Sequence, residues 1–169
     1  MSQAELAATV IALADQLVAR GWMLATAESC TGGGIAAACT DRAGSSAWFD
    51  RGFVTYSNAA KQEMLGVPAD LIEAHGAVSE PVARAMAQGA LTYSDAAVSV
   101  AVTGIAGPGG AVTGKPVGTV WFAWSLRDGR SWSECGCFEG DRAAVRAAAV
   151  AHGLKRLVQG LVDSEGSVV

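Results

Sequence analysis

The chain has 169 residues, of which 51% are hydrophobic, with 21 glycines and few aromatic side chains. This length predicts a single domain over residues 1–169 with a substantial core, and the composition is typical of a compact α/β domain with many tight turns. The net charge of −4 argues against a nucleic-acid-binding surface, because such surfaces are usually basic.

The N-terminal residues do not resemble a targeting segment. Residues 2–5 carry no cationic stretch, and no uninterrupted apolar run is long enough to cross a bilayer. We therefore expect a cytoplasmic protein with no membrane partner, whose cysteines stay reduced. The cysteines and histidines lack the spacing of a zinc site, so we expect no structural metal: Cys30, Cys39, Cys135, Cys137, His75 and His152.

The first half of the chain alternates between helical and strand patterns. A wide apolar stripe predicts a helix over residues 4–20, ended by Gly21. The apolar run 22–25 predicts a strand, and the alanine-rich segment 35–40 predicts a helix. The elements expected next are a loop at 43–46, a strand at 48–57, a helix at 58–65 capped by Asn58, and a short helix at 69–74.

The second half adds a hairpin to this alternation. Ser79, Glu80 and Pro81 are typical of a helix start, and the helix is expected to reach about residue 93. The apolar run 96–102 is typical of a strand covered on both faces. A glycine-rich loop at 103–114, strands at 117–126 and 131–138 joined by a turn at 127–130, a helix from the cap Asp141 to about 162, and a tail at 164–169 complete the prediction. The predicted fold is a three-layer α/β/α arrangement with a mixed, mainly parallel sheet.

The turn after the first strand is the strongest candidate for a site. Ser29, Cys30 and Thr31 precede three glycines and then a helix, where backbone N–H groups stabilise negative charge. Such a turn suits an oxyanion or a phosphate. Either Ser29 or Cys30 could be a nucleophile, and both need activation. The structural alternative is an ordinary strand–helix turn capped by Ser29 or Thr31.

Lys61 is the candidate base, because neither histidine is easily placed beside the Ser29 turn. A buried lysine with a lowered pKa can accept a proton. Tyr56 ends a predicted strand and Lys61 lies on the first turn of the next helix, which places both at the sheet edge where the Ser29 turn is expected. A solvated lysine on an amphipathic helix is the alternative, although Lys61 is the only lysine in the first two-thirds of the chain.

Two further segments could contact a ligand at the same edge. The glycine-rich segment 103–110 directly follows an apolar strand, so its backbone could approach a ligand closely, although a mobile surface loop is an equal alternative. It is not a Walker loop, since no Gly-Lys-Ser/Thr follows. Arg142 and Arg146 share a face near a helix start and could clamp a phosphate, or could simply be solvated.

With these motifs the chain resembles the CinA C-terminal domain family, the nicotinamide-nucleotide amidases. The resemblance covers nearly the whole chain, through residues 27–33, 43–49, 52–58, 75–80, 104–108, 115–120 and the turn at 140–142. It implies hydrolysis of the carboxamide of nicotinamide mononucleotide to nicotinate mononucleotide and ammonia, a step of pyridine-nucleotide salvage, with no metal or other cofactor.

The resemblance also implies roles for individual residues. Ser29 would be the nucleophile, Lys61 the base, and Tyr56 a hydrogen-bonding assistant. The residues that would bind substrate are Thr31, Gly32, Gly33, Asn58, Thr103, Gly104, Gly107 and Arg142, the last at the phosphate. A homo-oligomer, dimer or higher, is expected from the family and from aromatic residues that we expect to be exposed, namely Trp48, Phe49 and Trp132.

Two other hypotheses stay open on the sequence. Related domains carry competence or damage-inducible names, so the chain could be a non-catalytic nucleotide-binding regulatory module. Alternatively, Cys30 rather than Ser29 could be the nucleophile of a thiol hydrolase.

Overall fold

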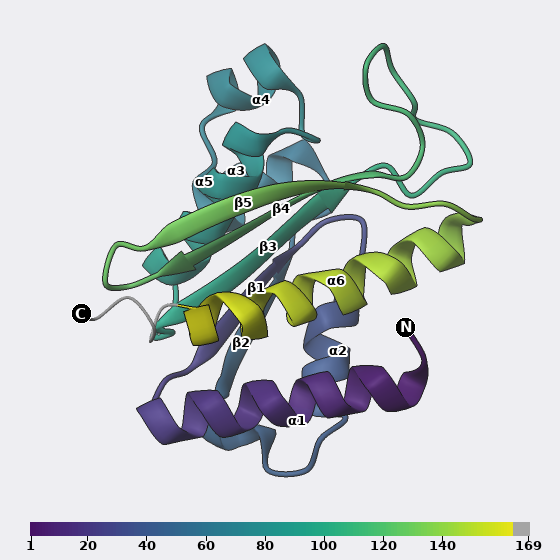
Figure 1. The fold of residues 1–169 in the computed structure, drawn as a ribbon. Helices are drawn as coiled ribbons and strands as arrows, with labels where there is room; N and C mark the ends of the chain where they lie inside the picture. The colour runs from purple at the N-terminus through teal and green to yellow at the C-terminus, as the bar shows by residue number, and fades with distance from the viewer. Residues whose placement is uncertain (164–169) are drawn as a thin grey trace.

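The computed structural model describes residues 1–163, and the tail predicted at 164–169 lies outside this range. Helices and strands alternate before a final hairpin and helix, as Figure 1 shows. In chain order the elements are α1 (Gln3–Arg20), β1 (Leu24–Glu28), α2 (Gly34–Thr40), the 3-10 turn η1 (Ser45–Ala47), β2 (Phe49–Val54), α3 (Asn58–Leu65), α4 (Ala69–His75), α5 (Glu80–Thr92), β3 (Val98–Gly104), β4 (Thr119–Leu126), β5 (Ser131–Cys137) and α6 (Arg142–Asp163).

The strands form one mixed sheet in the order β2-β1-β3-β4-β5. β1 pairs in parallel with β2 and β3, whereas β4 is antiparallel to both β3 and β5. Four of the five strands therefore run in one direction, and only β4 is reversed. Helices cover both faces (Figure 1), so the predicted three-layer arrangement with a mixed sheet is confirmed.

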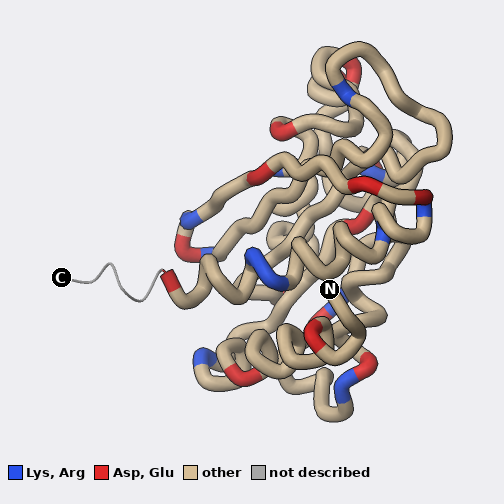
Figure 2. Tube along the Cα trace, turned by 45° about the vertical axis from the view of Figure 1, so that its right-hand side comes forward, with Lys and Arg blue, Asp and Glu red and all other residues tan. Residues whose placement is uncertain are grey.

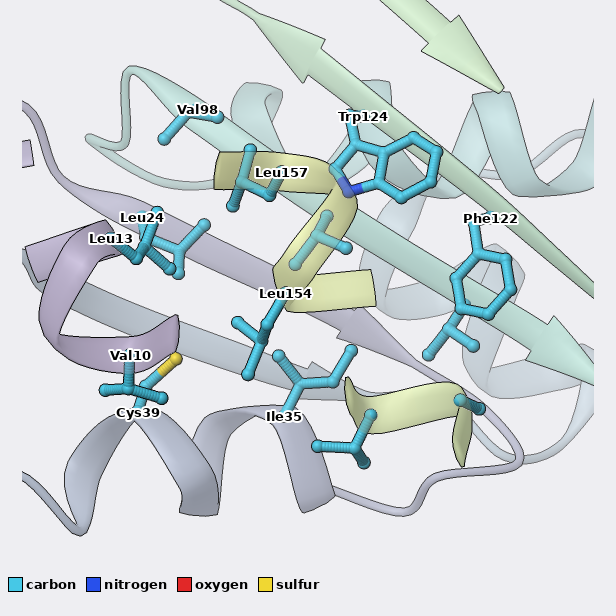
Figure 3. Close-up of a cluster of buried hydrophobic side chains, with 14 of the residues drawn as sticks. Val10, Leu13, Leu24, Ile35, Cys39, Val98, Phe122, Trp124, Leu154 and Leu157 are labelled. Atoms are coloured by element: carbon cyan, nitrogen blue, oxygen red, sulfur yellow. The ribbon is translucent and has the colours of Figure 1, made fainter. Parts of the chain in front are cut away.

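The two faces of the sheet are packed with side chains of different size. Large apolar residues fill the layer between the sheet and the helices α1, α2 and α6. They include Phe122 and Trp124 of β4 and Leu154 of α6, which Figure 3 shows in one cluster. The face covered by α3, α4 and α5 is rich in alanine, with Ala101 and Ala123 on the central strands. Alternate residues of a strand point to opposite faces, which separates the two sets.

Several predicted boundaries need correction. β1 starts at Leu24 instead of residue 22 and continues through Glu28, because all five of its residues are buried between two neighbouring strands. Residues 26–28, which lay outside the predicted strand, therefore belong to it. β2 is shorter than the predicted 48–57 strand. Among the described helices, none is both long enough and apolar enough to cross a membrane.

The helix caps follow the predictions in part. Asp141 caps α6 as predicted, by accepting from the Ala144 N–H at 2.9 Å. Asn58 does not cap α3: the cap is Ser57, whose backbone is extended and whose hydroxyl accepts the Ala60 N–H at 3.0 Å. Asn58 is instead the first helical residue.

The aromatic residues expected at the surface are not exposed. Trp48 is 1% exposed and belongs to the core, and Trp132 is half-buried, stacked on Trp124 with ring centroids 5.6 Å apart. The aromatic argument for self-association is therefore wrong, and the homo-oligomer stays a prediction from the family alone.

Candidate active site

The strand period explains where the Ser29 side chain lies. Leu24 packs in the α2 layer and Ala25 and Ala27 pack in the α5 layer, so odd-numbered positions of β1 face α5. Ser29 follows the strand directly and keeps this alternation, which directs its side chain to the α3 and α5 side. The turn is anchored to the neighbouring strand, because the Ser29 N–H donates to the Val102 carbonyl at 3.0 Å.

Lys61 reaches Ser29 from α3. Its side chain is 1% exposed, and Nζ lies 2.9 Å from Ser29 Oγ. Two backbone carbonyls complete the surroundings of the amine, Thr55 O at 2.8 Å and Tyr56 O at 3.2 Å. Burial lowers the pKa of Lys61 from 10.5 to about 8, because the charged form loses its hydration.

These contacts fit a base. A neutral amine has two N–H groups and one lone pair. If the two N–H groups donate to the carbonyls of Thr55 and Tyr56, the lone pair is left to accept the Ser29 hydroxyl proton. The geometry can therefore activate a serine hydroxyl for attack on a carbonyl carbon.

A cavity of about 250 Å³ opens beside this pair. Seven of the residues that the sequence analysis assigned to the site border this cavity: Ser29, Tyr56, Lys61, Thr103, Gly104, Gly107 and Arg142. The lining residues that the sequence analysis did not assign include Ala77 and Val78, from the connection between α4 and α5. A larger surface hollow of about 670 Å³ borders α1 and α6 but contains neither Ser29 nor Lys61, so it is not the candidate site.

Arg142 and Tyr56 lie together at this cavity. The Arg142 guanidinium donates to the Tyr56 hydroxyl and to the Gly107 carbonyl, both at 2.9 Å. Tyr56 is 60% exposed, and its backbone carbonyl, not its phenol, accepts from Lys61. The two arginines that we paired in the sequence separate: Arg142 borders the cavity, whereas Arg146 donates to the carbonyls of the Ser29 turn.

Four predicted substrate-binding residues do not border the cavity. The Thr31 hydroxyl is buried and donates to Glu28 at 2.7 Å. Gly32 and Gly33 form the turn into α2 with φ angles of 61° and 97°, which glycine adopts without strain. Asn58 is exposed at the start of α3.

The structure also reveals a functional candidate that the sequence analysis missed. Glu28 is 1% exposed, and its carboxylate accepts hydrogen bonds from the Ile35 and Ala36 N–H groups at 2.8 and 3.0 Å. The α2 amides that we expected to face a ligand anion therefore face Glu28. The period of β1 is the signal that could have placed it, because Glu28 and Ser29 are neighbours and must point to opposite faces.

Cys30 and the histidines are unsuited to the roles of nucleophile and base. Burial and the charge of Glu28 raise the pKa of the Cys30 thiol to about 11, so little thiolate exists near neutral pH. His152 packs against Phe122 and Phe138 on the opposite face of the sheet. His75 is exposed at the end of α4, and neither histidine borders the cavity.

Comparison with known proteins shows which family the chain resembles. The model of the CinA C-terminal domain matches residues 6–161. The chain is 51% identical to the nicotinamide-nucleotide amidohydrolase PncC of Enterobacter agglomerans, over 97% of this chain and 100% of that protein. It is 52% identical to the protein of the same name from Escherichia coli K12, over 94% of this chain and 96% of that protein.

The chain is also similar to solved structures. The competence damage-inducible protein A (ComA) of Klebsiella pneumoniae matches with a TM-score of 0.90 and 43% identity, over 93% of this chain and 97% of that chain. The competence/damage inducible protein CihA of Agrobacterium tumefaciens matches with a TM-score of 0.89 and 45% identity, over 92% and 94%. The protein belongs to the CinA C-terminal domain family.

Proposed function

We propose that this protein is a metal-independent amidase that converts nicotinamide mononucleotide to nicotinate mononucleotide and ammonia. The observation that carries the proposal is the buried 2.9 Å contact between Ser29 Oγ and Lys61 Nζ, in a cavity beside a glycine-rich loop. The names of the two relatives above, which span nearly the whole chain, support the choice of substrate.

The reaction proceeds through a covalent acyl-enzyme. Neutral Lys61 accepts the proton of Ser29 as Oγ bonds to the carboxamide carbon, and the tetrahedral oxyanion forms. The oxyanion collapses, the carbon–nitrogen bond breaks, and Lys61 returns its proton to the departing ammonia. Water then attacks the ester and Lys61 accepts one proton from the water. That proton passes to Ser29 Oγ as the bond between Oγ and the acyl carbon breaks, and the carboxylic acid formed releases its own proton to solvent.

The remaining cavity residues bind the nucleotide. The backbone of the loop from Gly104 to Gly110 borders the cavity and supplies N–H groups to the oxyanion or the ribose. Arg142 binds the phosphate, since its guanidinium faces only uncharged partners, Tyr56 and Gly107, in the hydrogen bonds above. The Tyr56 phenol accepts a hydrogen bond from Arg142 and therefore lies beside the position that we assign to the phosphate.

The test follows ammonia and nicotinate mononucleotide released from nicotinamide mononucleotide. Ser29→Ala and Lys61→Met are expected to lower kcat by about a thousandfold or more. Lys155→Met removes an exposed lysine of α6 and is the matched control, with activity unchanged. Full activity in Ser29→Ala would remove the proposed nucleophile.

Two outcomes would favour the other hypotheses. If Cys30→Ala is inactive while Ser29→Ala is active, the thiol is the nucleophile. If the wild-type protein binds the nucleotide tightly but releases no ammonia at any pH, the chain is a non-catalytic nucleotide-binding module.

A further inference from the structure

A carboxylate is buried directly behind the proposed nucleophile. Glu28 accepts four hydrogen bonds, and they divide evenly between its two oxygens. Oε1 accepts from the Thr31 hydroxyl at 2.7 Å and the Ile35 N–H at 2.8 Å, and Oε2 accepts from the Ala36 N–H at 3.0 Å and the Thr26 hydroxyl at 3.2 Å.

These donors come from three consecutive parts of the chain. Thr26 belongs to β1, Thr31 to the turn, and Ile35 and Ala36 to the first turn of α2. One side chain therefore connects the strand, the turn that carries Ser29 and the helix. The carboxylate also lies at the amino end of α2, where negative charge is favourable. Its burial is tolerated because both oxygens are hydrogen-bonded.

Arg146 holds the opposite polar groups of the same turn. From α6, its guanidinium donates to the Cys30 and Thr31 carbonyls, both at 3.1 Å. Glu28 thus holds the Thr31 hydroxyl of the turn, and Arg146 holds the two carbonyls of the same turn. Neither side chain borders the cavity, so neither is placed to contact substrate.

We propose that Glu28 and Arg146 are positioning residues that hold Ser29 in register with Lys61. This inference rests on the proposed amidase function. A single peptide bond separates Glu28 from Ser29, so a shift of the carboxylate moves the nucleophile. A displacement of about 1 Å at a reacting atom can lower the rate by about a hundredfold. The amino end of α2 is occupied by the protein's own carboxylate, which leaves the substrate phosphate to Arg142.

The test uses Glu28→Gln, which keeps the shape but turns one acceptor into an N–H₂ donor that faces a hydroxyl or backbone donor. We expect kcat to fall by about 10–100-fold with KM within about threefold of wild type. Arg146→Met should behave alike, and Arg146→Lys should recover part of the kcat. The matched control is Glu63→Gln, at an exposed position of α3, with unchanged kinetics.

The pH–rate profile, and the separate effects on kcat and KM, distinguish a general structural effect from a positioning effect. The acid limb of the pH–rate profile should keep its midpoint in Glu28→Gln, because Lys61 is untouched. Wild-type kcat in both Glu28→Gln and Arg146→Met would overturn the proposal, as would a rise in KM with kcat unchanged, which would mean a substrate contact. If Glu28→Gln does not fold, Arg146→Met and Arg146→Lys decide the question.

Hydrogen exchange separates this inference from the amidase proposal. The Ile35 and Ala36 amides should exchange faster in Glu28→Gln than in wild type, whether or not the protein hydrolyses any amide. Unchanged exchange would overturn the role of Glu28 itself. A wild-type protein without amidase activity would instead overturn the proposed function and, with it, the catalytic part of this inference.

Discussion

At the scale of single residues, the chemistry depends on the protonation of Lys61. With a pKa of about 8, roughly one tenth of the lysine is neutral at pH 7. We therefore expect kcat/KM for nicotinamide mononucleotide to rise about tenfold per pH unit below pH 7 and to level off above pH 8. A profile that is flat between pH 6 and 9 would contradict Lys61 as the base.

The same lowered pKa affects stability. The folded protein binds the Lys61 proton less tightly than the unfolded chain does, so the charged lysine destabilises the fold at all pH values below about 8. The destabilisation disappears as the pH rises from about 8 to 10.5. A shift of this size corresponds to roughly 3 kcal/mol.

Lys61→Met should therefore be more stable than wild type near neutral pH while being inactive, a trade-off between activity and stability. The measurement is the difference in unfolding free energy between the two proteins, followed from pH 7 to 10. The difference should shrink as the pH rises. A variant that is less stable at pH 7, with a difference independent of pH, would contradict this assignment.

The Ser29–Lys61 contact was predictable because both residues follow strands that run in parallel, and the carboxyl ends of parallel strands meet at one sheet edge. The alternation along β1 could have placed Glu28 on the face opposite Ser29. Its proposed role was not predictable, because two of its partners are backbone N–H groups, which carry no sequence signal. Thr31 illustrates the consequence: a hydroxyl in a glycine-rich turn fits a ligand contact or a buried hydrogen bond equally well, and the structure has the buried bond.

At the scale of elements, the position of Lys61 depends on how closely α3 packs on α5. Gly89 of α5 lies against the last residue of α3, and a Cβ at this position would collide with the Leu65 backbone carbonyl. A backbone atom cannot rotate away, so a larger residue must push the helices apart. The absence of a side chain at Gly89 thus sets the distance between α3 and α5.

Gly89→Ala is expected to destabilise the protein by about 1–3 kcal/mol and to lower kcat, because α3 carries Lys61 away from Ser29. Gly153→Ala, in α6, is the matched control. Its Cβ would meet its nearest neighbour, Ile35 Cδ1, at 3.4 Å, and alanine favours a helix by about 0.5–1 kcal/mol over glycine. Urea denaturation and steady-state kinetics test both. Equal effects of the two substitutions would contradict the packing argument.

The element boundaries illustrate how local signals compete. Ser57 and Asn58 are both good cap residues, and the sequence alone does not choose between them. The strand end at Val54 leaves Ser57 in extended backbone, and this geometry makes it the cap. The strands and helices themselves were predictable, because apolar residues recur along the sequence at the spacing of a helix or a strand.

At the scale of the whole molecule, charge is dispersed and the proposed phosphate contact is local. Figure 2 shows basic and acidic positions interspersed over the described elements, not gathered on one face. With a net charge of −4, long-range attraction of an anionic nucleotide is weak. Binding of the substrate phosphate must therefore come from short contacts such as those we assign to Arg142.

The two faces of the sheet are packed differently, so we expect a core substitution on the face opposite Lys61 to lower stability with little effect on kcat. Leu154 is fully buried in the large-residue layer (Figure 3), on the sheet face opposite Lys61. Leu154→Ala should cost about 2–5 kcal/mol through lost contacts and a residual cavity, which corresponds to a Tm lower by roughly 5–15 °C. Because α6 contacts the Ser29 turn through Arg146, nearer its amino end, the folded variant should keep its kcat within about threefold.

The exposed residue Val162 of the same helix provides the control, since Val162→Ala should change the Tm little. Thermal unfolding and kinetics at a temperature where both variants are folded give the two readouts. A large loss of kcat in folded Leu154→Ala would mean that packing around α6 sets the geometry of Ser29, and that the two layers are coupled through the sheet. An unchanged kcat would leave the alanine-rich layer, with α3 packed closely on α5, as the part of the fold that positions the base.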